Sequence, residues 1–130
     1  MKFGPEFEKL FFKLSLAKPK YLEKIQKGFY TSEETDIMNT LAKKFHDKFH
    51  ETPSKDQMLM LVNSDKVKGN VEESLMELVY NTDLTQYDDE WLTSTIESWI
   101  KWSNFNSTLF DTIEYIKTTE VTPDNADSII

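Results

Sequence analysis

Two histidines are the most obvious candidates for metal chemistry in this sequence. His46 and His50 lie four residues apart in the segment HDKFH, and on a helix this spacing can place two imidazoles on one metal ion. A metalloprotease would need the order His-Glu-x-x-His, but Asp47 stands where that pattern requires Glu. Asp47 and Glu51 are the nearest acidic residues, and the sequence indicates no third ligand. We therefore predict no metal site, and we keep a small metal-dependent enzyme using His46 and His50 as an alternative.

Two clusters of carboxylates could be mistaken for the acid–base pairs of hydrolases. They are Glu72, Glu73 and Glu77, and Asp88, Asp89 and Glu90. Each falls where a helix is predicted to begin, and negative charge there offsets the helix dipole by a few tenths to about 1 kcal/mol. The three glycines cannot form the phosphate loop G-x4-G-K-[ST], and the sequence has no nucleophile elbow. We predict no catalytic residue, no cofactor-binding residue and no enzyme activity in this chain.

Composition and charge narrow the class of protein further. The 130 residues include no Cys, so neither a disulfide framework nor thiolate chemistry is available. No apolar run approaches the roughly 18 residues that a membrane-spanning helix needs, and the first residues do not resemble a signal peptide. We therefore expect a cytoplasmic protein with no membrane partner.

The net charge of −8 is unevenly distributed along the chain. Residues 1–68 carry 13 Lys and 10 acidic residues, whereas residues 69–130 carry 2 Lys and 13 acidic residues. No Arg is present, although Arg is the usual residue for forked recognition of phosphate and guanine. The three Trp could stack on bases, but Lys101 is their only basic neighbour. We expect at most weak, non-specific contact with single-stranded DNA.

Apolar residues at helical spacing predict several short helices in the first part of the chain. The first helix is expected to begin at Gly4-Pro5, because Pro at the first helical position loses no hydrogen bond, and to end before Pro19. A short helical turn over residues 21–25 is expected to stop at Gly28. Thr31 with Glu34, and Ser54 with Gln57, form two predicted capping boxes. No alternating run predicts a strand.

A long helix is predicted over residues 90–117, which corresponds to about 42 Å. Its first half places Leu92, Ile96, Trp99 and Ile100 along one face. Its second half places another apolar set on a rotated face, and these residues are our candidates for a partner interface: Trp102, Phe105, Leu109, Ile113 and Ile116. Thr122-Pro123-Asp124 is typical of the cap of a returning helix, but the chain stops at Ile130.

The predicted fold is therefore all-α, with a small globular helical head followed by a long helix that forms one arm of a truncated helical hairpin. We assign residues 1–82 to the head and residues 83–130 to the long helix and the start of the second arm. The two parts are expected to form one structural domain.

The order of these elements resembles the N-terminal domain of DnaB-like replicative helicases, particularly the T-even-type phage proteins. That family has an apolar helix, a Tyr-Phe-like pair, a helix of the form I-x3-L/I-x3-F/Y, a Pro-Ser/Thr cap and a further helix bearing Leu. The similar positions here are Tyr21-Leu22, Phe29-Tyr30, Ile37, Leu41, Phe45, Phe49, Pro53-Ser54 and Met58. The family's entry into a long hairpin helix is similar to Trp91-Leu92, Phe105-Asn106 and Ile113-Glu114-Tyr115-Ile116.

The resemblance implies a non-catalytic collar of a hexameric helicase. Such collars pair into dimers and a trimer of dimers, dock primase and receive the helicase loader. ATP and Mg²⁺ would then be needed only in a motor domain, which this sequence lacks, and the location would be the host cytoplasm if a phage encodes the protein. Two alternatives share the fold: the helicase-binding domain of a DnaG-type primase and a free-standing helical adaptor.

Overall fold

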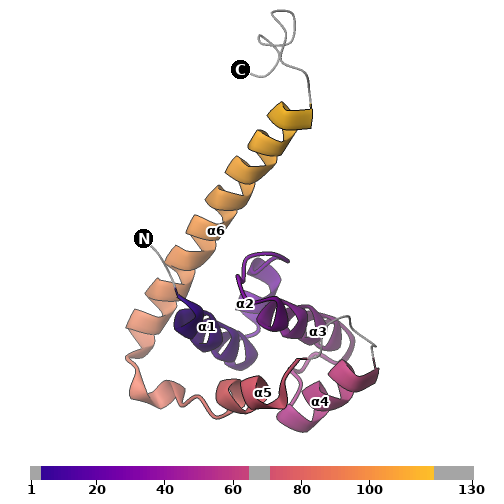
Figure 1. The fold of residues 1–130 in the computed structure, drawn as a ribbon. Helices are drawn as coiled ribbons and strands as arrows, with labels where there is room; N and C mark the ends of the chain where they lie inside the picture. Colours follow the sequence, from indigo (N-terminus) through magenta and orange to yellow (C-terminus); the bar gives the residue numbers. More distant parts are fainter. Residues whose placement is uncertain (1–3, 65–70, 119–130) are drawn as a thin grey trace, which may run out of the picture.

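The computed structural model describes residues 4–64 and 71–118, and side chains within the last helix as far as Leu109. Every regular element in these residues is helical, which confirms the predicted all-α fold (Figure 1). The elements are α1 (Pro5–Ala17), α2 (Lys20–Lys24), α3 (Glu33–Phe49), α4 (Lys55–Ser64), α5 (Glu73–Tyr80), the 3-10 helix η1 (Leu84–Gln86) and α6 (Asp89–Thr118). The second hairpin arm, predicted within residues 119–130, lies outside the described residues.

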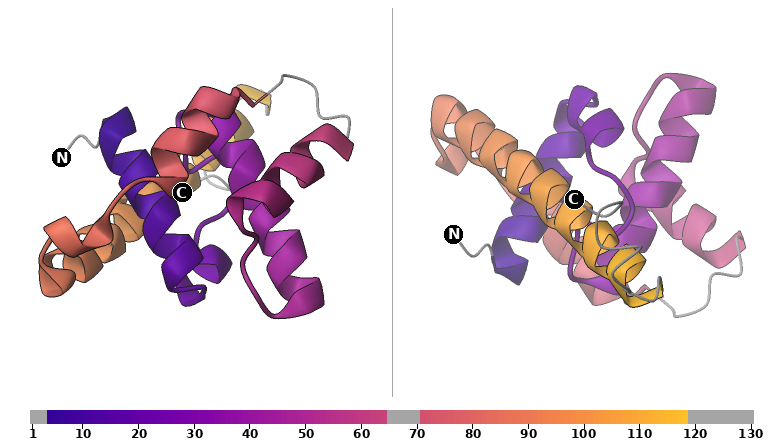
Figure 2. Two further views of the ribbon diagram at one scale, coloured as in Figure 1. Left: turned by 90° about the horizontal axis from the view of Figure 1, so that it is seen from below. Right: turned by 90° about the horizontal axis from the view of Figure 1, so that it is seen from above.

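The first helix occupies the centre of the head. Pro5 takes the first helical position of α1, as predicted, and α1 ends at Ala17 before the second proline. Phe11, Phe12 and Leu14 are completely or almost completely buried. They are buried because α1 contacts α2, α3, α5 and η1, and because α6 crosses it (Figure 2).

The start of α3 differs from the prediction by one residue. Ser32, rather than Thr31, caps the helix, and its hydroxyl accepts a hydrogen bond from the Thr35 N–H at 3.3 Å. Thr31 is turned instead toward Glu8 of α1, whose carboxylate accepts from the Thr31 N–H at 2.7 Å and from its hydroxyl at 2.5 Å. Glu34, the predicted reciprocal partner, accepts a hydrogen bond from the backbone just before α5 at 3.0 Å. A contact between distant segments therefore overrides the local capping pattern.

The second capping box is confirmed. The Ser54 hydroxyl accepts from the Gln57 N–H at 3.2 Å, and the Gln57 side chain accepts from the Ser54 N–H at 2.9 Å. This reciprocal pair starts α4, which buries Met58 in the core. The Tyr80 hydroxyl donates to the Pro53 carbonyl at 2.9 Å and so holds the end of α5 against the start of α4.

The first half of α6 closes the core. Trp99 is almost completely buried, and its ring centroid lies 4.9 Å from that of Phe11, 6.2 Å from Phe29 and 5.0 Å from Tyr30. The same face buries Leu92, Ile96 and Ile100, the residues that the sequence placed along one face with Trp99. Beyond this point α6 continues as a rod past the head (Figure 1). Within residues 4–64 and 71–118, no helix combines the length and apolar character required to cross a bilayer.

Candidate protein-interaction site

The second half of α6 presents an apolar face that the head does not cover. Trp102, Phe105 and Leu109 are 39%, 68% and 48% exposed, and we refer to these three residues as the α6 stripe. Their spacing of three and four residues places them on one side of the helix. Ile113 and Ile116, the other two predicted interface residues, belong to α6, but their side chains lie outside the described residues.

Burial along α6 ends at Ser103. The Ser103 side chain is buried, and residues 104–109 after it are all exposed. A surface hollow of about 380 Å³ adjoins the α6 stripe here, between Trp102 and the loop that contains Gly28 and Phe29. The stripe is therefore continuous with a recess at the edge of the head, which gives a partner both an apolar surface and a shape to match.

The exposed rings are the type of side chain on which protein interfaces depend. Trp and other aromatic anchors carry much of the energy of interfaces, and contiguous apolar patches on a protein surface mark interaction sites. Residues 102–109 contain no charged residue, and Lys101 adds one basic charge beside them. The described part of the stripe thus offers apolar contact with little charge of its own.

The histidines lie in different environments, and the structure brings a residue to one of them that the sequence did not indicate. The Nδ1 atom of His46 lies 3.9 Å from Oε1 of Glu23 in α2. Glu23, His46 and Asp47 each place one potential ligand atom within 4.8 Å of the others. His50 is exposed at the end of α3 with a left-handed backbone, and it does not join this group. Sequence reasoning missed Glu23 because it belongs to another helix.

The predicted capping role of the carboxylate clusters is confirmed for one side chain. Asp88 accepts from the Trp91 N–H at 2.9 Å and caps the start of α6. Asp89 pairs with Lys18 of α1 at 3.0 Å, and Glu77 pairs with Lys55 of α4 at 3.2 Å. Both pairs are exposed, so each contributes at most about 1 kcal/mol to stability.

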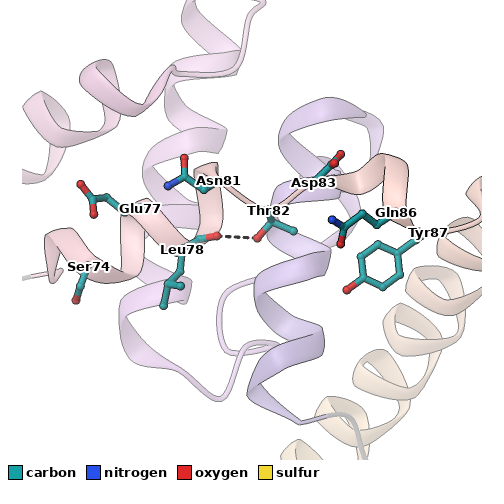
Figure 3. Close-up of a pocket in the computed structure, with 8 residues that line it drawn as sticks. All are labelled: Ser74, Glu77, Leu78, Asn81, Thr82, Asp83, Gln86 and Tyr87. Carbon is teal, nitrogen blue, oxygen red and sulfur yellow. Dashed lines mark hydrogen bonds between the residues drawn. The ribbon is translucent and has the colours of Figure 1, made fainter.

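A second hollow, of about 630 Å³, lies between α5 and η1 (Figure 3). Its lining extends from α5 through the turn after it to the residue that follows η1. The following residues line it: Ser74, Glu77, Leu78, Asn81, Thr82, Asp83, Gln86 and Tyr87. The Thr82 hydroxyl donates to the Leu78 carbonyl at 2.7 Å, which holds the turn after α5. This second hollow is a separate candidate for binding, distinct from the α6 stripe.

Comparisons with models of protein families, with curated proteins and with solved structures found no match for this chain. The geometry therefore defines the class of protein as an all-α domain with one long helix. The first half of that helix packs on the head, and Trp102, Phe105 and Leu109 of its second half are exposed.

Proposed function

We propose that this chain is a non-catalytic protein-interaction domain whose α6 stripe packs against a helix of a second copy or of another protein. The observation that carries the proposal is the exposure of Trp102, Phe105 and Leu109 on one side of α6. An amphipathic helix that leaves apolar residues at this spacing uncovered is the usual element of helix-to-helix recognition.

Within that class, we propose that the domain is the collar of a phage DnaB-like hexameric replicative helicase. It would join subunits into dimers and a trimer of dimers, and would dock primase and the helicase loader during DNA replication. Support for this finer assignment comes from the order of motifs in the sequence, from Tyr21-Leu22 to Phe105-Asn106. The all-α fold with its projecting helix agrees with that assignment without being specific to it.

Leu109→Asp tests the role of the α6 stripe. If the stripe packs in a dry interface, an aspartate there leaves a carboxylate without a partner, and self-association or primase binding should weaken by at least about 30-fold, corresponding to roughly 2 kcal/mol. Sedimentation equilibrium measures self-association, and pull-down with the primase of the same genome measures docking.

Met60→Asp provides the matched control, because Met60 is also an exposed apolar residue on a helix, at 70% exposure, but lies on α4. It should leave association unchanged, and circular dichroism should show both variants folded. Normal association and primase binding by Leu109→Asp would refute the role of the stripe.

The collar assignment has its own test in the reading frame after the codon for Ile130. A frame that completes a second helical arm and continues into a Walker-type phosphate loop would support a helicase collar. A stop codon at that point would rule out the collar assignment and leave a free-standing helical adaptor, while the interaction role of the α6 stripe would stand on the Leu109→Asp result.

A further inference from the structure

The surface around α5, η1 and the start of α6 is strongly acidic. Residues 71–100 contain eight acidic residues and no Lys, Arg or His. Two of the eight are neutralised by the ion pairs of Glu77 with Lys55 and of Asp89 with Lys18. Lys13 of α1 donates to the Tyr80 carbonyl at 2.7 Å and offsets one more charge. The region keeps an excess of negative charge, which attracts a basic partner by long-range electrostatics.

The hollow between α5 and η1 gives this acidic region a recess in which a ligand can bind. Leu78 is 58% exposed and Tyr87 is 42% exposed, so two large apolar side chains line a polar recess. Figure 3 shows the Tyr87 ring and the Gln86 amide projecting back toward Thr82, with Asp83 beside Gln86 on the same side and Glu77 across from them on α5.

Two of the lining side chains are held in place by their neighbours. The Tyr87 ring stacks on Trp91, with centroids 5.9 Å apart and an interplanar angle of 15°. The Asp83 carboxylate accepts from the Thr85 N–H at 3.0 Å and from its hydroxyl at 2.6 Å, and these bonds lower the pKa of Asp83. The hollow therefore presents an aromatic face and a fixed negative charge before any ligand arrives.

We propose that this hollow binds a basic segment of a partner protein, with one Lys or Arg side chain laid across Leu78 and Tyr87 and its cation directed toward Asp83. The aliphatic stem of such a side chain matches the apolar wall, and its charged end matches both the ring face and the carboxylate. A neutral or acidic segment would satisfy only the apolar wall. This surface is separate from the α6 stripe, and its use does not depend on the collar assignment.

A fluorescein-labelled peptide of alternating Arg and Ala provides the probe, measured by fluorescence anisotropy at about 0.15 M salt, where distant surface charges are largely screened. Asp83→Asn retains the cap of η1 because Asn also accepts at that position. Tyr87→Leu retains apolar area and removes the ring face. Each should weaken peptide binding by about two- to five-fold, the range of an exposed cation–π or ion-pair contact.

Glu33→Gln is the matched control, because Glu33 is an exposed acid in the first turn of α3 and its replacement changes the net charge by the same amount. This variant should bind the peptide as the wild type does, and so should Leu109→Asp. Amide shift mapping should place the peptide on residues 74–87. No detectable binding, equal weakening by Glu33→Gln, or shifts spread over all acidic surfaces would overturn the proposal, since the last two results would show unspecific charge attraction.

Discussion

The buried carboxylate of Glu8 offers the sharpest test of how this head is assembled. Glu8 is 1% exposed and receives three hydrogen bonds from the chain just before α3: from the Thr31 N–H, the Thr31 hydroxyl and the Ser32 N–H at 3.3 Å. Glu8→Gln preserves the shape of the side chain but replaces one acceptor oxygen with an NH₂ group. That group donates rather than accepts, so the Thr31 hydroxyl must turn to accept from it, and the Thr31 and Ser32 N–H groups are left with a neutral acceptor.

The expected loss follows from the strength of the bonds involved. A hydrogen bond to a charged group contributes about 1.5–3 kcal/mol, compared with about 1 kcal/mol for a neutral one. Weakening the three bonds from charged to neutral strength should lower the free energy of unfolding by about 2–4 kcal/mol. Urea titration followed by Trp fluorescence measures this value, because Trp99 is buried in the core and reports its opening.

Glu6→Gln is the control for the change in charge. Glu6 lies in the same first turn of α1 and is exposed, so its replacement removes the same interaction with the helix dipole, worth at most about 1 kcal/mol, without touching the α3 junction. If Glu8→Gln proves no less stable than Glu6→Gln, the carboxylate does not anchor α3 and the reasoning is refuted.

Two further predictions concern the neighbouring loop. Gly28 has a φ of +92° and open space where a Cβ would stand. Gly28→Ala should therefore lower the free energy of unfolding by about 1–2 kcal/mol through backbone strain alone. Gly4 has a φ of −84°, so Gly4→Ala should lower it much less, and urea titration of the two variants measures the difference. Burial raises the pKa of the Tyr30 hydroxyl far above its usual range. The unfolded chain releases this proton near pH ~10 and the folded chain keeps it, so stability should fall above that pH, and less steeply in Tyr30→Phe; unfolding at several alkaline pH values measures the slopes.

Local patterns in the sequence predicted most of the helices, and long-range contacts account for what they missed. Ser54 and Gln57 are three residues apart, so their capping box depends only on their own segment and was confirmed. Thr31 and Glu34 form an equally good local capping pattern. Glu8 of α1 instead accepts the hydrogen bonds of the Thr31 N–H and hydroxyl, so the predicted box does not form. A charged residue in the first turn of a helix predicts solvent exposure, and nothing within the segment around Glu8 indicates that α3 will begin against it.

The candidate surfaces also divide into those that a local pattern predicts and those that depend on contacts between distant segments. The spacing of Trp102, Phe105 and Leu109 predicted a shared face, because a face depends only on helical geometry, and all three are exposed. The hollow between α5 and η1 depends on how the chain turns after Tyr80, which no periodicity encodes. The same holds for Glu23 beside His46, which meet only when α2 packs against α3.

The central position of α1 has a consequence for biosynthesis. Phe11 leaves the ribosome well before the Trp99 ring that packs on it has been made. Chains fold vectorially during synthesis, and apolar surface that waits for a distant partner is prone to aggregation. The nascent chain therefore exposes the side of α1 that faces Trp99 until α6 has been made, even when α2, α3 and α5 already cover its other sides. Fragments that terminate before Trp99 should depend on chaperones or precipitate, whatever the stability of the finished domain.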